Sequence, residues 1–70
     1  MTIKHPLRAF RDANGMTLGD LAEQIGVKPN TVWRWENGRV PERPMWARIE
    51  KVTGIKPDQI VRFVAEGAAA

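Results

Sequence analysis

The sequence contains no cysteine, no serine and no tyrosine, and it has a single histidine, His5. Without cysteine the chain can form neither a disulfide framework nor a zinc finger. It also lacks the cysteine and serine nucleophiles of covalent catalysis, and no glycine-rich phosphate loop is present. One histidine does not make a metal site. These absences predict a protein that is not an enzyme, with no catalytic residue, cofactor or metal.

Long apolar runs are also missing. No stretch approaches the roughly 18 apolar residues of a membrane span, and the first residues, from Met1 to Pro6, lack the apolar run of a signal peptide. Together with the missing cysteine, this predicts a cytoplasmic protein that does not bind membranes. Strand-like alternation and internal repeats are absent too. At 70 residues the chain is one small domain, and its expected fold class is all-α.

Glycine, proline and asparagine divide the chain into five helix-length segments. The expected helices cover about residues 6–13, 18–25, 30–37, 42–53 and 57–65. Thr17 and Asp20 are spaced to form a capping box at the start of the second helix. The helical spacing of apolar residues places Trp35 and Trp46 in the core, and His5 either caps the first helix or is solvated. We expect residues 1–66 to form the domain and residues 67–70 to be a disordered tail.

The charges are unevenly distributed. The net charge is only +3, but the segment from Lys28 to Arg48 contains five cations and two acids. The segment from Asp12 to Glu23 contains three acids and no cation. A basic segment on a small basic domain favours a polyanionic partner such as nucleic acid.

Residues 17–38 have the pattern of a helix-turn-helix. Two short helices are joined by Gly26, Val27 and Lys28, and a link this short forces them to cross steeply. Gly26 supplies the left-handed backbone conformation that the turn needs, and Ala22 is small where the two helices approach each other. On the second of these helices, Val32, Trp35 and Glu36 point one way, whereas Asn30, Arg34 and Asn37 point the other way.

The outward face of this helix has side chains that can recognise bases. Asn can form two hydrogen bonds with adenine, and Arg can form two with guanine. Residues 21–38 resemble the Cro-type helix-turn-helix domain of lambda-repressor-like and xenobiotic-response-element regulators. The matching positions are Leu21, Ala22, Ile25, Gly26 and Val27, then Asn30, Thr31 and Val32, and then residues 34–38. The resemblance covers about residues 7–63, and residues 39–42 and 49–54 further resemble the YdaS-like Cro subgroup.

The resemblance implies a five-helix, lambda-repressor-like DNA-binding domain and a set of contact residues. The residues at base-contacting positions are Pro29, Asn30, Trp33 and Arg34. The resemblance places Asn37, Arg39 and Arg43 at positions that contact the DNA backbone. Thr17, Lys28 and Thr31 are added as backbone contacts because they lie at the helix starts, whose N–H groups can meet phosphates. The resemblance also implies a structural ion pair between Arg11 and Glu36.

The chain departs from the family pattern at several of these positions. Many relatives have Gln where this chain has Leu18, so the backbone N–H groups there would have to bind phosphate alone. Lys28 stands at a cap position and cannot cap a helix, although it can reach a phosphate. Pro29 and Trp33 offer apolar contacts, for example to thymine methyl groups. Trp33 has two further interpretations, because it could pack against a neighbouring helix or form a dimer contact.

The sequence therefore predicts a sequence-specific, double-stranded DNA-binding transcription regulator. We expect a repressor of the phage or prophage type, or an antitoxin-like autoregulator with a toxin partner, that binds a palindromic operator as a homodimer. The alternative is a protein–protein interaction module that keeps the helix-turn-helix shape without binding DNA. The basic outward face favours DNA, whereas the apolar Trp33 favours the alternative.

Overall fold

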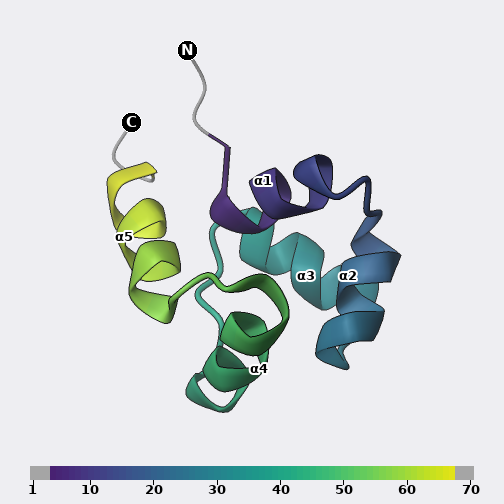
Figure 1. The fold of residues 1–70 in the computed structure, drawn as a ribbon. Helices are drawn as coiled ribbons and strands as arrows, with labels where there is room; N and C mark the ends of the chain where they lie inside the picture. The colour runs from purple at the N-terminus through teal and green to yellow at the C-terminus, as the bar shows by residue number, and fades with distance from the viewer. Residues whose placement is uncertain (1–3, 68–70) are drawn as a thin grey trace.

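The computed structural model describes residues 4–67, and within that range the secondary structure is entirely helical, as the sequence predicted (Figure 1). In chain order the helices are α1 (Pro6–Ala13), α2 (Leu18–Ile25), α3 (Pro29–Glu36), α4 (Arg43–Thr53) and α5 (Pro57–Gly67). In Figure 1, α3 crosses the middle of the molecule behind α1 and α4, with α2 on one side and α5 on the other. The most extensive packing between helices is that of α2 on α3.

The ends of three helices differ slightly from the expected ones. α3 begins and ends one residue earlier than predicted, because Pro29 itself takes the first helical position. α4 begins at Arg43 rather than Glu42, which is its N-cap. α5 continues to Gly67, two residues beyond its expected end at Ala65. Residues 68–70 of the expected tail lie outside the described residues.

The turns around α2 follow from local chemistry. The Thr17 hydroxyl oxygen accepts the Asp20 backbone N–H at 3.0 Å, and the Asp20 carboxylate accepts the Thr17 backbone N–H at 3.0 Å. This is the predicted capping box, and its hydrogen bonds from Thr17 lower the pKa of Asp20. At the other end of α2, Gly26 adopts a φ of +92°, a backbone conformation that residues with a β-carbon rarely adopt. The helix-turn-helix therefore has a defined start and a defined turn.

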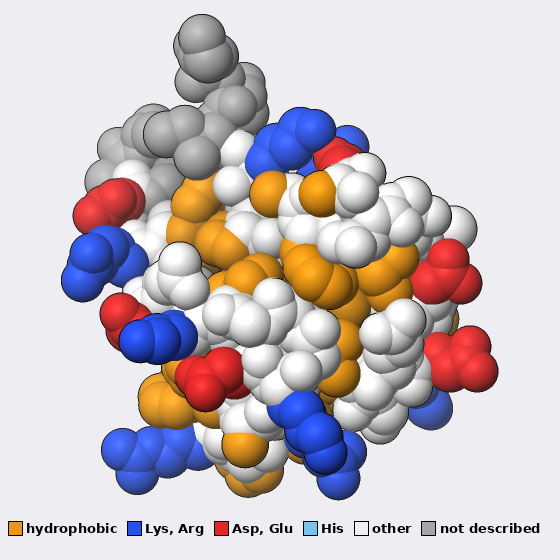
Figure 2. Space-filling model, in the orientation of Figure 1, with side chains coloured by type: hydrophobic (Ala, Val, Ile, Leu, Met, Phe, Trp, Pro, Cys, Tyr) orange, Lys and Arg blue, Asp and Glu red, His pale blue; other side chains and the backbone are white. Residues whose placement is uncertain are grey.

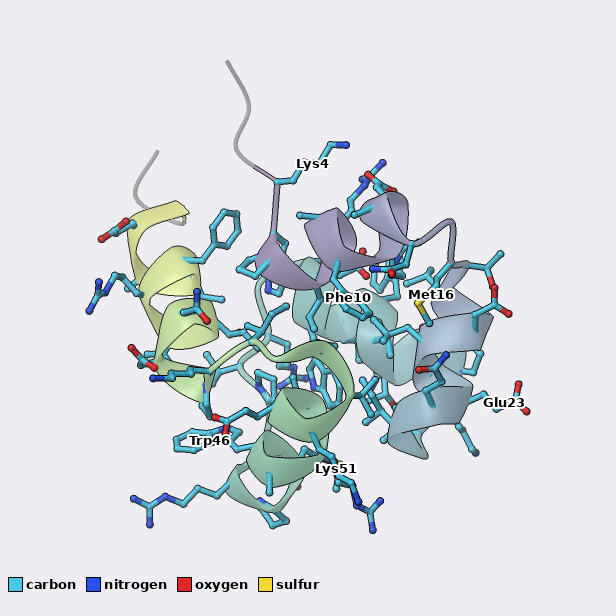
Figure 3. The ribbon with its side chains drawn as sticks, in the orientation of Figure 1. Lys4, Phe10, Met16, Glu23, Trp46 and Lys51 are labelled. Atoms are coloured by element: carbon cyan, nitrogen blue, oxygen red, sulfur yellow. The ribbon has the colours of Figure 1, made fainter. Side chains whose placement is uncertain are left out.

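The hydrophobic core lies where the five helices of residues 4–67 meet. Its buried members are Leu7, Leu21, Ala22, Ile25, Val32, Trp35, Ile49 and Ile60. Phe10 and Met16 cover this cluster on the side of α1 and are only partly buried (Figure 3). On the face shown in Figure 2, hydrophobic side chains gather between the helices and charged side chains surround them. A domain of this size leaves part of its apolar surface exposed.

The expectation that Trp46 belongs to the core is wrong. On α4 the residues that pack into the core are Met45, Ile49 and Val52. Trp46 is half-buried on the side of α4 away from α2, where its indole N–H donates to the Pro41 carbonyl at 2.8 Å (Figure 3). Met45 and Trp46 point about 100° apart around the helix, and α4 is turned so that Met45 rather than Trp46 packs against the core.

His5 joins the start of α1 to α5. Its Nδ1 accepts the Leu7 backbone N–H at 3.1 Å, so His5 caps the helix, which is one of its two expected roles. The other expected role, a solvated side chain, is wrong because His5 is buried. The ring meets Phe63 of α5 edge to face, with centroids 5.1 Å apart. Its Nε2 is buried without a hydrogen-bond partner among the described residues. Burial lowers the pKa of His5, and the smaller effect of the Glu36 charge acts in the opposite direction.

Arg11 of α1 and Glu36 of α3 form a two-pronged ion pair. Arg11 Nε donates to Glu36 Oε2 at 2.7 Å, and Arg11 Nη2 donates to Oε1 at 2.8 Å. A third bond runs from Nη1 to the Met16 carbonyl at 3.3 Å, in the loop before α2. Side-chain exposure is 14% for Arg11 and 7% for Glu36. The hydrogen bond to Glu36 raises the pKa of Arg11. The guanidinium thus links α1 to the end of α3 and to the loop before α2.

Two further properties concern residues 4–67 only. The longest helices have 11 residues, and none is long and apolar enough to cross a membrane. Over the same range, no three His, Asp or Glu side chains are grouped so that they could hold a metal ion.

The state of His5 predicts a loss of stability in mild acid. Below the ordinary His pKa of 6.5, the unfolded chain binds a proton that the folded imidazole resists, because burial disfavours the charged ring and so lowers its pKa. The free energy of unfolding should therefore be greatest above pH 6.5 and should fall as the pH drops through the lowered pKa of the folded state. Urea titrations at a series of pH values measure this effect.

The matched control is His5→Asn. Asn is a good N-cap residue with a side-chain oxygen that can accept the same N–H, but it does not titrate. This variant should keep the cap and lose the dependence on pH near 6.5. Asp12 and Asp20 titrate at lower pH, since hydrogen bonds from Lys4 and Thr17 lower their pKa values. An equal fall in both proteins would show that His5 is not the responsible group.

Breaking the ion pair should destabilise the fold. Arg11→Ala leaves the nearly buried Glu36 carboxylate without its partner, which we expect to lower the free energy of unfolding by about 2–4 kcal/mol. The matched control is Arg8→Ala, an exposed arginine of the same helix, which should cost under about 0.5 kcal/mol. A double-mutant cycle with Glu36→Ala tests the coupling. Strictly additive losses would mean that the two side chains do not stabilise each other.

Candidate nucleic-acid interface

The two sides of α3 are chemically distinct. Val32 and Trp35 are buried against the rest of the domain. The four residues that the sequence placed at base-contacting positions are all exposed, namely Pro29, Asn30, Trp33 and Arg34. Trp33 is 52% exposed and is the most exposed of the large hydrophobic residues that the structure describes. The structure thus leaves the outward face of α3 open over its whole length.

The turn between α2 and α3 sets where this face begins. Leu21 and Ala22 of α2 and Val32 of α3 have no exposed surface, so the two helices pack directly on each other. Lys28 is the N-cap residue of α3, makes no side-chain capping bond and is exposed, as its chemistry predicted. Pro29 follows at the first helical position. The exposed surface therefore starts at the N-terminal end of α3, where the positive end of the helix dipole attracts anions.

Arg34 and Arg39 lie close together. Both line a hollow with Trp33 and Asn37, and both line a second hollow with Thr31 and Val40. Both arginines are exposed. Arg39 follows the helix, and its backbone N–H donates to the Arg34 carbonyl at 3.0 Å. Two predicted contact residues of different classes, one for bases and one for the backbone, thus share one surface.

The side-chain amide of Asn37 already makes one hydrogen bond within the protein. It is the C-cap residue of α3, and its side-chain Nδ2 donates to the Trp33 carbonyl at 2.8 Å. A side-chain amide has two N–H donors, so one remains to reach a phosphate. The bond to the carbonyl also holds the amide on the same side of the helix end as Trp33.

Thr17 and Arg43 lie at the ends of the candidate surface. The Thr17 hydroxyl accepts from Asp20 in the capping box, which leaves its own O–H free to donate at the start of α2. The Arg43 guanidinium lies over the ring of Trp46, 5.8 Å from the centroid, at the start of α4. Arg43 does not line the hollows that Arg34 and Arg39 share. The structure thus brings Arg39, but not Arg43, to the surface of α3.

Leu18 is a side chain to which the sequence gave no role in binding. It is half-buried, packs against the core and lines a hollow with Pro29, Asn30 and Trp33. A β-carbon on Gly19 would stand 4.0 Å from Pro29 Cγ, so the first turn of α2 lies directly beside the first turn of α3. The available signal was that Leu18 and Pro29 occupy the first positions of the two helices that the short turn brings together.

Cations in and just before α1 flank the same surface. Lys4, Arg8 and Arg11 line a hollow that also includes Trp33 and Glu36. Lys4 pairs with Asp12 at 2.7 Å and Arg11 pairs with Glu36, whereas Arg8 is exposed. Of these three cations, Arg8 is therefore the one whose charge is not offset by an ion pair. Taken together, the surface offers amide and guanidinium donors with an apolar strip between them, which suits a polyanion that presents a groove.

Comparisons with known proteins agree with this geometry. A helix-turn-helix family model matches residues 7–60. A relative from Gallus gallus, the endothelial differentiation-related factor 1 homolog, is 38% identical over 47 residues, which are 66% of this chain and 32% of the relative. The chain thus spans about a third of that relative's length. No solved structure matches the chain at a significant level.

The family match covers most of the chain, including α1 from Leu7 on, all of α2 to α4 and the turn at Gly26. It does not identify the finer YdaS-like subgroup. The protein belongs to the Cro/C1-type helix-turn-helix family of DNA-binding regulatory domains.

Proposed function

We propose that the protein is a sequence-specific transcription regulator that places α3 in the major groove of double-stranded DNA. The observation that carries this proposal is the exposure of Pro29, Asn30, Trp33 and Arg34 on one side of α3, opposite the buried Val32 and Trp35. The major groove is wide enough to admit an α-helix, and Asn and Arg are the side chains that bond adenine and guanine with two hydrogen bonds each.

The backbone contacts of this proposal come from the ends of the helices. Thr17, Lys28 and Thr31 lie at or near the starts of α2 and α3, where the positive ends of the helix dipoles add to the attraction of phosphates. Asn37 and Arg39 lie at the other end of α3, and Arg43 at the start of α4. These side chains fix the position of α3 along the groove without reading sequence themselves.

Specificity is expected to come from a homodimer. An eight-residue α3 reaches only a few base pairs, and two copies on a palindromic operator double the bases read. A bound dimer would repress transcription by occluding the polymerase. Repressors of the phage type and antitoxins that act on their own promoters both work in this way, and either role fits the proposed interface. A toxin partner is implied only by the second role.

Phosphate neutralisation predicts a strong dependence on salt. The logarithm of the binding constant should fall linearly with the logarithm of the salt concentration, by about 0.9 for each phosphate contact. Arg39→Ala should reduce this slope by about 0.9 on specific and random duplexes alike. Fluorescence anisotropy with a labelled duplex over a salt series measures it. Arg62→Ala on the exposed side of α5 has the same charge change and should leave the slope unchanged.

Base reading predicts a loss that depends on sequence. Asn30→Ala and Arg34→Ala should each weaken binding to a duplex selected from a random library by about 1–3 kcal/mol. Neither side chain is buried, so the free energy of unfolding should stay within about 0.5 kcal/mol of the parent. Binding of Asn30→Ala to random DNA should change little, because a neutral amide does not neutralise phosphate.

Two outcomes separate this proposal from the protein–protein module. If the parent enriches no duplex from the library and its salt slope is near zero, the protein does not act on DNA. If it enriches a duplex that both variants bind like the parent, α3 is not the reading helix. In either case the exposed Trp33 would be better explained by a protein partner.

A further inference from the structure

The hollow between the first turns of α2 and α3 has an unusual lining for a base-reading surface. Its volume is about 340 Å³, and its walls are Leu18, Pro29, Asn30 and Trp33. Three of these side chains are apolar and the fourth is a neutral amide. No charged residue lines it, although the neighbouring hollow at the other end of α3 is lined by Arg34 and Arg39.

Two walls of this hollow are held in fixed positions. Leu18 packs against the core, and the ring of Pro29 is restricted by its place at the start of α3. Because these two groups are already ordered, a small apolar group that enters the hollow loses little binding energy to their reorganisation.

Among the major-groove edges of the four base pairs, the only methyl group is the one on C5 of thymine. Guanine presents two acceptors and cytosine an amino donor, and the hydrocarbon side chains of Leu18 and Pro29 can bond neither. The indole N–H of Trp33 is a donor that can meet guanine, so the preference for thymine rests on the apolar surface of the hollow. Adenine presents the donor and acceptor that match the amide of Asn30. The lining as a whole therefore suits a thymine beside an adenine.

We propose that the hollow formed by Leu18, Pro29 and Trp33 takes the 5-methyl group of a thymine next to the adenine that Asn30 bonds. This inference rests on the proposed function, since it needs α3 in the major groove. It assigns Leu18 and Trp33 to base specificity, and Leu18 acts through its side chain rather than only through its backbone N–H.

The experiment removes single methyl groups from the DNA. A duplex is first selected by the full chain from a random library made with the four ordinary bases. Each thymine of the selected duplex is then replaced in turn by uracil, which lacks only the 5-methyl group. At one thymine or more, the parent should bind the uracil duplex about fourfold more weakly, which corresponds to about 0.8 kcal/mol for one buried methyl.

The assignment to this hollow is tested with Trp33→Ala and Leu18→Ala. The readout is the ratio of thymine to uracil affinity within each variant, so partial unfolding of a variant cancels. Both ratios should fall from about four to near one. The matched control is Val61→Ala, which removes an exposed valine of α5 and should keep the ratio of the parent.

A further substitution in the DNA distinguishes recognition of the methyl group from recognition of the rest of the base pair. At the same position, replacing the T·A pair by C·G should weaken binding, and 5-methylcytosine in place of that cytosine should recover about fourfold. No recovery would mean that the adenine alone is read there.

Each remaining outcome is decisive. If a duplex is selected and no uracil replacement weakens its binding, the hollow does not take a methyl group, while the proposed function stands. If the ratio of Trp33→Ala equals that of the parent, a different surface reads the methyl. If no duplex is enriched, the proposed function fails and this inference fails with it.

Discussion

The ion pair between Arg11 and Glu36 fixes the rotation of α3, and the composition of the exposed face depends on that rotation. α3 has only eight residues, and it packs on α2 and the core through the buried Val32 and Trp35. Glu36 adds a directional bond, because a two-pronged pair with a guanidinium is planar and tolerates little rotation. Since residues on a helix are separated by 100°, fixing Glu36 also fixes the directions of Asn30 and Arg34.

The same guanidinium links this orientation to the rest of the helix-turn-helix. Its third bond reaches the Met16 carbonyl, directly before the capping box that starts α2. The start of α2 and the end of α3 are therefore held relative to α1 by polar bonds, while Leu21, Ala22 and Val32 hold the two helices together by packing. Both sets of contacts act on the side of α3 that faces the protein, and none uses the proposed reading residues.

The sequence predicted most of the fold because the relevant signals are local. The capping box of Thr17 and Asp20 and the left-handed Gly26 depend on a few neighbouring residues, and both appear where expected. Trp46 shows where this reasoning fails. Its helix offers two adjacent candidates for the core, and the choice between Trp46 and Met45 depends on the position of α4 relative to the other helices, which no local pattern contains.

Part of the candidate site was likewise predictable from local sequence, and part depends on the tertiary structure. Helical spacing was sufficient to separate the outward residues of α3 from Val32 and Trp35. The hollow with Leu18 was not predictable in this way, since its walls come from two helices and exist only once the turn brings their first residues together. The burial of His5 is also tertiary, because it depends on Phe63, far away in the chain.

The three tryptophans show what the surface of α3 is suited to do. Trp35 is buried in the core, and Trp46 is half-buried with its indole N–H bonded to a carbonyl. Trp33, by contrast, leaves about half of its surface in water, on the same face as Asn30 and Arg34. Packing and hydrogen bonding within the domain account for the first two but not for the third. The exposed indole of Trp33 contributes its apolar area to binding only when a partner covers it. The major groove presents both polar base edges and methyl groups, so it matches the two polar side chains and the indole together.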